Sequence, residues 1–250
     1  MAPADVPDTP WNALHQLLRE QAARPLLTYY DDASGERVEL SVASVENAVA
    51  KTANLLVDGL ALDPGAVVAV HLPLHWQHAV WQGAVWAAGM VLAPYGDPAT
   101  ADLLVVGPDD LALAAGAAEA VAVSLDPMGM PFRDPLQPGV LDHAVEARMH
   151  GDRFAPPPVP ADAPVLVSGP DASAHSWRQL VGHAEDLGGR LGLPPGGRLM
   201  TSADPDTLDG TVAMLALPLT VGGSAVLVRH EDVGRRTDRL AVERVDAVLT

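Results

Sequence analysis

The sequence predicts an α/β fold built from two pseudo-repeated parallel-sheet subdomains that pack together through helices. Short apolar segments alternate with amphipathic segments of helical period, which is the pattern of parallel strands covered by helices on both faces. The turn Pro64-Gly65 has a counterpart in Pro195-Gly196, 131 residues later, and Gly89 has a counterpart in Gly222, 133 residues later. Two nearly equal offsets across the same order of elements indicate an internal repeat.

The first elements follow from local signals. Thr9 caps a helix that begins at Pro10, because a hydroxyl accepts from free amides at the helix start and proline is preformed for its first turn. Strand-like residues at 26–30 and 37–42 flank the turn residues 31–35, which predicts a hairpin. Ser41 then caps a helix that ends near Gly59.

The middle of the chain continues this alternation. The predicted elements are a strand at 66–72, a helix from Pro73 to about Ala88, strands at 90–94, 103–106 and 120–125 with an alanine-rich helix between the last two, and a short helix at 141–149. Trp81 and Trp86 fall at helical spacing and are predicted to lie in the core, whereas the place of Trp76 stays open.

A proline-rich spacer divides the chain. Residues 156–162 include four prolines, a composition typical of a stiff extended segment. We therefore predict a first subdomain at 1–155, with the N-terminal helix and hairpin, and a second at 163–250. In the second, the predicted elements are strands at 165–167, 198–202 and 225–228, with helices at about 176–191 and 208–219.

The composition narrows the function classes. The 250 residues carry 15 basic and 32 acidic side chains, a net charge of −17, so nucleic acids and anionic membranes are poor partners. The absence of cysteine excludes disulfides, thiolate metal sites and thiol nucleophiles. No leader and no long apolar run is visible, so a cytoplasmic location is expected. The single lysine, Lys51, limits any lysine-dependent chemistry to one position.

Two long segments of the chain resemble the adenylate-forming (AMP-binding) superfamily, which contains acyl-CoA synthetases, peptide-synthetase adenylation domains and luciferases. The residues that carry the resemblance are Leu62-Asp63-Pro64-Gly65, Val68 to Pro73 and Ala87 to Pro94 within the segment from Leu40, and then Leu191 to Arg198 and Val221 to Val228. The resemblance implies the N-terminal domain of those enzymes as the fold, and ATP or AMP with Mg²⁺ as ligands.

The chain departs from this family where its chemistry lies. The family has a Ser/Thr/Gly-rich loop ending in Pro-Lys-Gly around the ATP phosphates, and the matching segment here is 165–176. Ser168-Gly169 is kept, but the loop is about four residues shorter, the lysine is missing and Asp171 adds a negative charge. Acidic residues at 202–210 stand where the family contacts the acyl group. The nucleotide-binding motifs and C-terminal domain would follow Thr250, so the resemblance predicts a truncated, degenerate N-terminal domain.

Any retained ligand site is expected at the carboxyl ends of the strands, where helix N-termini offer free amide donors. The candidate ligand-binding residues are Ser168, Gly169, Ser173, His175, Ser176, Ser202, Asp204 and Asp206. The three acids at 171, 204 and 206 repel a triphosphate, which favours a neutral or weakly anionic ligand.

Alternative interpretations of these polar residues stay open. His75 and His78 are weak candidates for metal ligands, against the interpretation that they line the strand edge and the helix start. Ser168, Ser173, His175 and Ser176 could form a nucleophile and base, or Ser173 or Ser176 could cap the next helix. Asp204 and Asp206 could bind a divalent cation, or stabilise a helix N-terminus.

Two functions therefore compete. In the first, the protein is a non-catalytic homologue, a pseudoenzyme, whose crevice binds a nucleotide, an acyl metabolite or a protein partner. In the second, it is an ATP-dependent acid-activating ligase with an atypical loop or a second chain that supplies the missing domain. A purely structural role is the third class. The absence of a lysine from the loop favours the first.

Overall fold

The computed structural model describes residues 7–169 and 171–250, and its strands form two sheets. The five-stranded sheet has the order β12 (Ala247–Leu249), β10 (Arg198–Thr201), β11 (Ser224–Arg229), β1 (Pro25–Asp31) and β2 (Glu36–Ser41). The seven-stranded sheet has the order β7 (Val140–Asp142), β6 (Ala120–Ala122), β5 (Leu103–Val106), β3 (Val67–His71), β4 (Val91–Pro94), β8 (Pro164–Ser168) and β9 (Ser173–Ser176). All neighbours pair in parallel except the hairpins β1–β2 and β8–β9.

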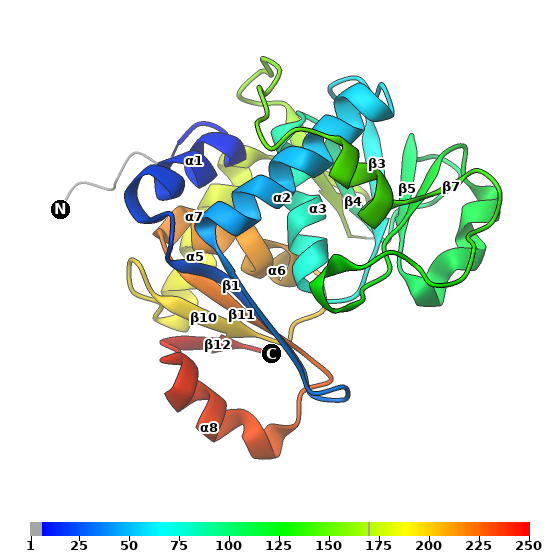
Figure 1. Cartoon of the computed structure of the whole chain (residues 1–250). Helices are drawn as coiled ribbons and strands as arrows, with labels where there is room; N and C mark the ends of the chain where they lie inside the picture. Colours follow the sequence, from blue (N-terminus) through cyan, green and yellow to red (C-terminus); the bar gives the residue numbers. More distant parts are fainter. Residues whose placement is uncertain (1–6, 170) are drawn as a thin grey trace.

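A layer of helices separates the two sheets, as predicted (Figure 1). It contains α1 (Pro10–Gln21), α2 (Val42–Asn54), α3 (Trp76–Ala87), α5 (Trp177–Leu191), α6 (Leu208–Thr211) and α7 (Leu217–Val221), with π-helical turns at η1 (Leu55–Gly59) and η5 (Val212–Ala216). The main core joins these helices to the inner faces of both sheets. Trp81 and Trp86 are buried in it, which confirms their prediction as core residues.

The outer faces of the sheets have smaller covers. The helix α8 (Val233–Glu243) lies below the five-stranded sheet in Figure 1 and contributes Leu240 to a small core over Met200 and Val226. The 3₁₀-helix η2 (Pro108–Gly116) covers the outer face of the seven-stranded sheet. No helix in the described ranges 7–169 and 171–250 is long and apolar enough to cross a membrane.

The internal repeat is visible in the strand order. The run β9-β8-β4-β3-β5 in one sheet matches β2-β1-β11-β10-β12 in the other. The match extends to single hydrogen bonds: Asp102, before β5, accepts from the amide of Val67 at 2.8 Å, and Asp246, before β12, accepts from the amide of Arg198 at 2.7 Å. The prediction that strands 66–72 and 198–202 occupy equivalent positions in similar sheets is confirmed.

The two sheets do not divide at residues 156–162. The hairpin β1–β2 precedes this segment but pairs with β11, and β8–β9 follows it but pairs with β4. Each repeat thus places its hairpin on the other repeat's sheet, where it covers a strand edge that would otherwise be open. The proline-rich segment is also packed rather than a free spacer, because Val159 Cγ1 lies 2.4 Å from where a Cβ on Gly89 would be.

Several local predictions need correction. The helix predicted from Pro73 begins at Trp76, because His75 stays extended and its Nδ1 caps the amide of Gln77 at 3.1 Å. The alanine-rich helix is 3₁₀, and the strand predicted at 120–125 ends at Ala122. The helix predicted at 141–149 is preceded by β7 and splits into α4 (His143–Glu146) and η4 (Ala147–Met149).

Candidate functional site

The carboxyl ends of strands from both sheets meet around Tyr95, which directly follows β4. Its ring lies 5.2 Å from the ring of His71 at the end of β3, and its hydroxyl donates to the carbonyl oxygen of Leu72 at 2.9 Å. Across the edge, Arg229 at the end of β11 pairs with Asp109 at 3.8 Å. This is the region where open α/β sheets hold their ligands.

The edge around Tyr95 is acidic. Burial raises the pKa of Tyr95 to about 12, and the nearby carboxylates of Asp204, Asp110 and Asp206 add to the shift. The phenol therefore stays neutral and acts as a hydrogen-bond donor. A polyphosphate at this edge would be repelled by these three carboxylates. Arg229 opposes their negative charge but is itself paired with Asp109, so the edge disfavours highly charged anions.

The segment matched to the family's phosphate loop is a short hairpin turn. Strand register places Ser168 opposite Ser173, so four residues connect β8 to β9. The amide of Ala172 donates to the carbonyl oxygen of Gly169 at 3.0 Å, and proline at position 170, which lies outside the described residues, has no amide hydrogen to offer. A phosphate cradle needs several converging amides and a cation, and this turn leaves at most two amides.

Ser168, His175 and Ser176 of this hairpin have side-chain partners within the structure. Ser168 Oγ lies 3.4 Å from His175 Nε2, and no carboxylate in the described part of the chain accepts a hydrogen bond from His175. Ser176 caps α5 in a capping box with Gln179, which matches one of the two roles proposed for it. Ser173 is exposed at the start of β9. The interpretation as a nucleophile and base therefore lacks an orienting acid here.

The acidic segment after β10 forms a turn before α6. Ser202 Oγ donates to Glu231 Oε2 at 3.0 Å, and Asp204 Oδ1 accepts from the amide of Asp206 at 3.0 Å. The residue that caps α6 is Thr207, whose Oγ1 accepts from the amide of Gly210. The prediction that Asp204 or Asp206 caps this helix is therefore wrong. Within the described residues, no hydrogen bond or ion pair joins this segment to the β8–β9 hairpin.

The two candidate metal-ligating histidines are buried beside the start of α3. His75 Nδ1 caps this helix, and His78 Nδ1 lies 3.2 Å from the carbonyl oxygen of Pro73. Burial lowers the pKa of His75 to about 3 and that of His78 to about 4. No group of three or more possible metal-ligating side chains occurs in residues 7–169 and 171–250. This geometry supports the interpretation that they line the strand edge.

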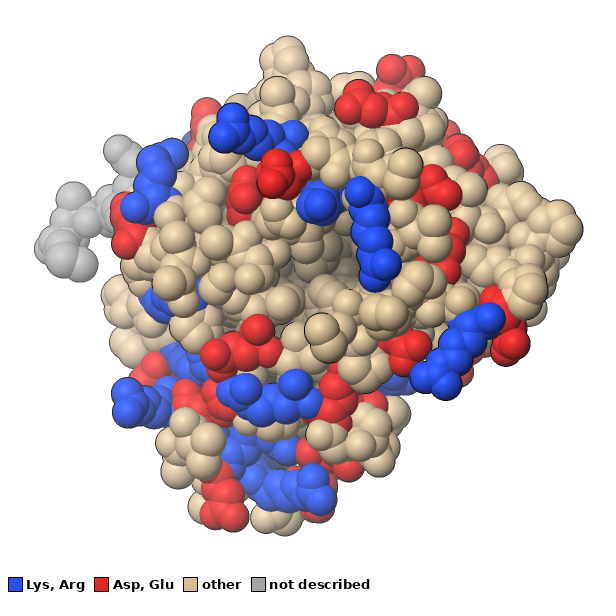
Figure 2. Space-filling view, viewed as in Figure 1, with Lys and Arg blue, Asp and Glu red and all other residues tan. Residues whose placement is uncertain are grey.

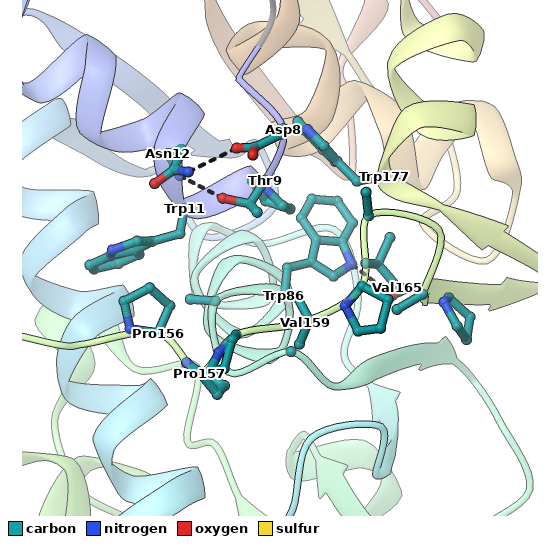
Figure 3. Close-up of a pocket in the computed structure, with 18 residues that line it drawn as sticks. Asp8, Thr9, Trp11, Asn12, Trp86, Pro156, Pro157, Val159, Val165 and Trp177 are labelled. Carbon is teal, nitrogen blue, oxygen red and sulfur yellow. Dashed lines mark hydrogen bonds between the residues drawn. The ribbon is translucent and has the colours of Figure 1, made fainter.

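A second feature lies at the opposite end of α3, where tryptophans and prolines line a cavity of about 220 Å³ (Figure 3). Trp86 donates to the carbonyl oxygen of Val165 at 2.9 Å, and its ring lies 5.8 Å from that of Trp177. Pro156 and Pro157 line the same cavity. Its walls join the proline-rich segment to α3 and β8, which explains why that segment is packed.

Sequence reasoning singled out Asp204 and Asp206 but missed Tyr95, Asp110 and Arg229. Tyr95 directly follows an apolar strand and Arg229 ends one, and that position was the available signal. Both Tyr95 and His230 have positive φ, at 49° and 50°, just beyond β4 and β11. Such conformations in residues other than glycine are uncommon and concentrate at functional sites.

The sheets and the helix layer define this protein as one with the fold of the N-terminal domain of adenylate-forming enzymes. A Brucella canis acyl-CoA synthetase matches with a TM-score of 0.77 and 17% identity, over 94% of this chain and 46% of its own. The anthranilate CoA ligase AuaEII, solved with anthranoyl-AMP, gives 0.75 and 17%, over 99% of this chain and 50% of its own. The Streptomyces lividans acetoacetyl-CoA synthetase gives 0.72 and 18%, over 88% and 38%.

The chain thus spans half or less of the length of these solved enzymes. A Mycobacterium tuberculosis (strain ATCC 25618 / H37Rv) protein, called a TIGR03089 family protein, is 38% identical over 245 residues, which are 94% of this chain and 96% of the relative. This chain belongs to the TIGR03089 family. No family model matches the sequence.

Proposed function

We propose that this protein is a non-catalytic member of the adenylate-forming fold that binds a neutral or weakly anionic ligand at the carboxyl edge of its strands. The observation that carries the proposal is the four-residue turn between Ser168 and Ser173. It replaces the longer lysine-containing loop of the family with a hairpin that has few free amides and carries Asp171.

The expected loss of affinity for nucleotides follows from the hydrogen bonds that the phosphate loop would have supplied. A charge-assisted hydrogen bond contributes about 1.5–3 kcal/mol, so losing the lysine and one or two donors lowers the affinity for phosphates by roughly 10²–10⁴-fold. The only lysine lies on α2 and lines a different pocket. An acyl metabolite, a mononucleotide such as AMP, or a protein partner therefore fits the edge better than ATP.

Titration of AMP and Mg·ATP against the wild type and Asp171→Ser tests this proposal. Mg·ATP should bind the wild type with a Kd above about 1 mM, and AMP should bind at least as tightly. Asp171→Ser should tighten ATP binding by about threefold to tenfold, because it removes a like charge next to the phosphates. Asp186→Ser, at an exposed position of α5, is the matched control and should leave the affinity for ATP unchanged.

Micromolar binding of ATP to the wild type, unchanged in Asp171→Ser, would contradict the electrostatic account. Calorimetry gives these affinities directly. Thermal shifts give a second readout, since a ligand at 100 times its Kd adds about 2.7 kcal/mol to the free energy of unfolding.

A further inference from the structure

A pocket of about 280 Å³ lies between α2, the start of α3, the 3₁₀-turn η3 (Pro127–Gly129) and the α4–η4 segment. It shares no lining residue with the cavity of Figure 3, and none of the predicted site residues lines it. In Figure 2 the face that carries α2 and α4 is hollowed near its centre, with blue side chains at the edge of the hollow.

The pocket is cationic in an acidic protein. Its lining includes Lys51 and Arg148 and no carboxylate, although the chain has 32 acids and a net charge of −17. In the described residues the Lys51 side chain makes no ion pair or hydrogen bond. Arg148 makes only a 3.4 Å contact with the carbonyl oxygen of Gly129 and a 3.9 Å contact with the sulfur of Met130. Two uncompensated cations beside one cavity favour an anion.

The wall of the pocket is held by a buried hydrogen-bonded pair. Thr52 Oγ1 donates to the carbonyl oxygen of Ala48 at 2.9 Å, so it accepts from His143 Nε2 at 3.0 Å. His143 therefore carries its proton on Nε2 and keeps an acceptor at Nδ1. Burial lowers the pKa of His143 to about 4, so the ring is neutral at physiological pH and the two cations supply the charge.

Two buried polar atoms beside the pocket have no hydrogen-bond partner among residues 7–169 and 171–250. They are Trp76 Nε1, a donor, and Gln77 Oε1, an acceptor, and both residues line the cavity. Gln77 is 97% buried, since only 3% of its surface is exposed. Leaving a buried polar atom unpaired costs about 1–3 kcal/mol, a cost expected where a ligand or bound water completes the site.

Apart from Asn47, the remaining lining residues are small or apolar. Ala48, Val80 and Ala144 line the cavity. Met128 on the lining and Met149 on η4 are 85% and 81% exposed. Methionine adapts to different apolar partners and is overused at binding surfaces. We infer that this pocket binds a small organic anion, with a carboxylate or phosphate head group held by Lys51 and Arg148 and an apolar body against the α3 and α4 walls.

Three small probes test the site: benzoate, phenyl phosphate and the uncharged analogue benzamide. Fluorescence reports binding because Trp76 lines the pocket. At least one anion should bind with a Kd of about 0.1–1 mM, the range set by its few heavy atoms, and at least fivefold more tightly than benzamide. The ratio of the Kd values of benzoate and phenyl phosphate shows whether the site prefers a carboxylate or a phosphate.

Substitutions locate the binding. Lys51→Gln and Arg148→Gln should each weaken binding of the anion by about fivefold to tenfold and leave benzamide unchanged. Lys51→Arg should keep most of the affinity, and Arg178→Gln, at an exposed position of α5, should keep all of it. Circular dichroism of each variant confirms that it folds.

The inference is overturned if neither anion binds more tightly than benzamide, or if both neutralising variants bind as the wild type does. It does not rest on the proposed function, because the pocket lies apart from the β8–β9 turn and the acidic edge. Micromolar binding of ATP at the strand edge would overturn the proposed function and leave the inference about the anion pocket intact.

Discussion

Lowering the pH from 6.5 to 5 is expected to remove about 5 kcal/mol from the free energy of unfolding. Burial lowers the pKa of His75 to about 3 and those of His78 and His143 to about 4, whereas the ordinary value is 6.5. Between pH 6.5 and 5 the unfolded chain therefore takes up protons on these three imidazoles, and the folded chain does not. Each histidine lowers the free energy of unfolding by about 1–2 kcal/mol over this interval, because the slope reaches its full value of about 1.4 kcal/mol per pH unit only below pH 6.5. The sum is a large part of a total stability of about 5–15 kcal/mol.

The sign of this effect is fixed by the direction of the shifts. Their contribution to stability is complete above pH 6.5 and is lost as the pH falls towards the folded-state values. The carboxylates of Asp31, Glu231 and Glu243, whose pKa values are lowered by hydrogen bonds from partners such as His230, Arg236 and Tyr30, lose their contribution only at lower pH. The histidines thus dominate between pH 6.5 and 5.

Urea titrations at both pH values measure the loss. His143→Gln removes one titrating group and should reduce the loss from about 5 to about 3 kcal/mol. A free energy of unfolding that stays constant from pH 6.5 to 5 would contradict the burial of neutral histidines at α3 and α4.

Gly223→Ala should lower the free energy of unfolding by about 3–5 kcal/mol and the Tm by about 10 °C. A Cβ at this position would lie 2.2 Å from the carbonyl oxygen of Gly197, and that oxygen accepts from the amide of Ser224 at 3.1 Å, the bond that begins the β10–β11 pairing. The obstacle is backbone, so a side-chain rotation cannot relieve it.

Gly182→Ala provides the matched control for the glycine prediction. Gly182 lies inside α5, where an added Cβ meets nothing within 4 Å. Since alanine favours the helix, this substitution should raise the free energy of unfolding by about 0.5–1 kcal/mol. Thermal and urea unfolding of both variants measures these changes in the free energy of unfolding. A decrease of less than about 1 kcal/mol in Gly223→Ala would contradict the close approach of position 223 to the carbonyl oxygen of Gly197.

The repeat could be predicted from the sequence because its marks are local. The turns at Pro64 and Pro195 and the glycines 89 and 222 lie at fixed places around equivalent strands, and caps at Thr9, Ser41 and Ser176 set the helix starts. The exchange of hairpins between the sheets could not be predicted in this way. Strand composition does not determine which of two open edges a hairpin covers, β4 or β11, because that choice depends on long-range packing.

The candidate site was predicted only in part. The sequence predicted a shortened loop between the strand at 165–167 and the helix start at Ser176, but not the strand β9, which makes this segment a hairpin with a four-residue turn. Arg229 and Asp109 pair, and Asp204 and Asp206 approach Tyr95, across more than 100 residues of sequence, so no local pattern brings them together. The pocket around Lys51 and Arg148 was missed for the same reason. Lys51 alone is a lysine near the end of a helix, and its meaning comes from an arginine 97 positions later.

Pyrophosphate exchange tests the central claim, that this chain does not form acyl adenylates. The purified protein would be incubated with Mg·ATP, labelled pyrophosphate and a panel of aliphatic, aromatic and amino acids, with the label in ATP as the readout. We predict no acid-dependent exchange above background, because the Ser168–Ser173 turn lacks the lysine and the amides that hold the phosphates. Exchange that requires one of these acids and reaches the rate of ordinary enzymes, about 1–10 per second, would contradict the account.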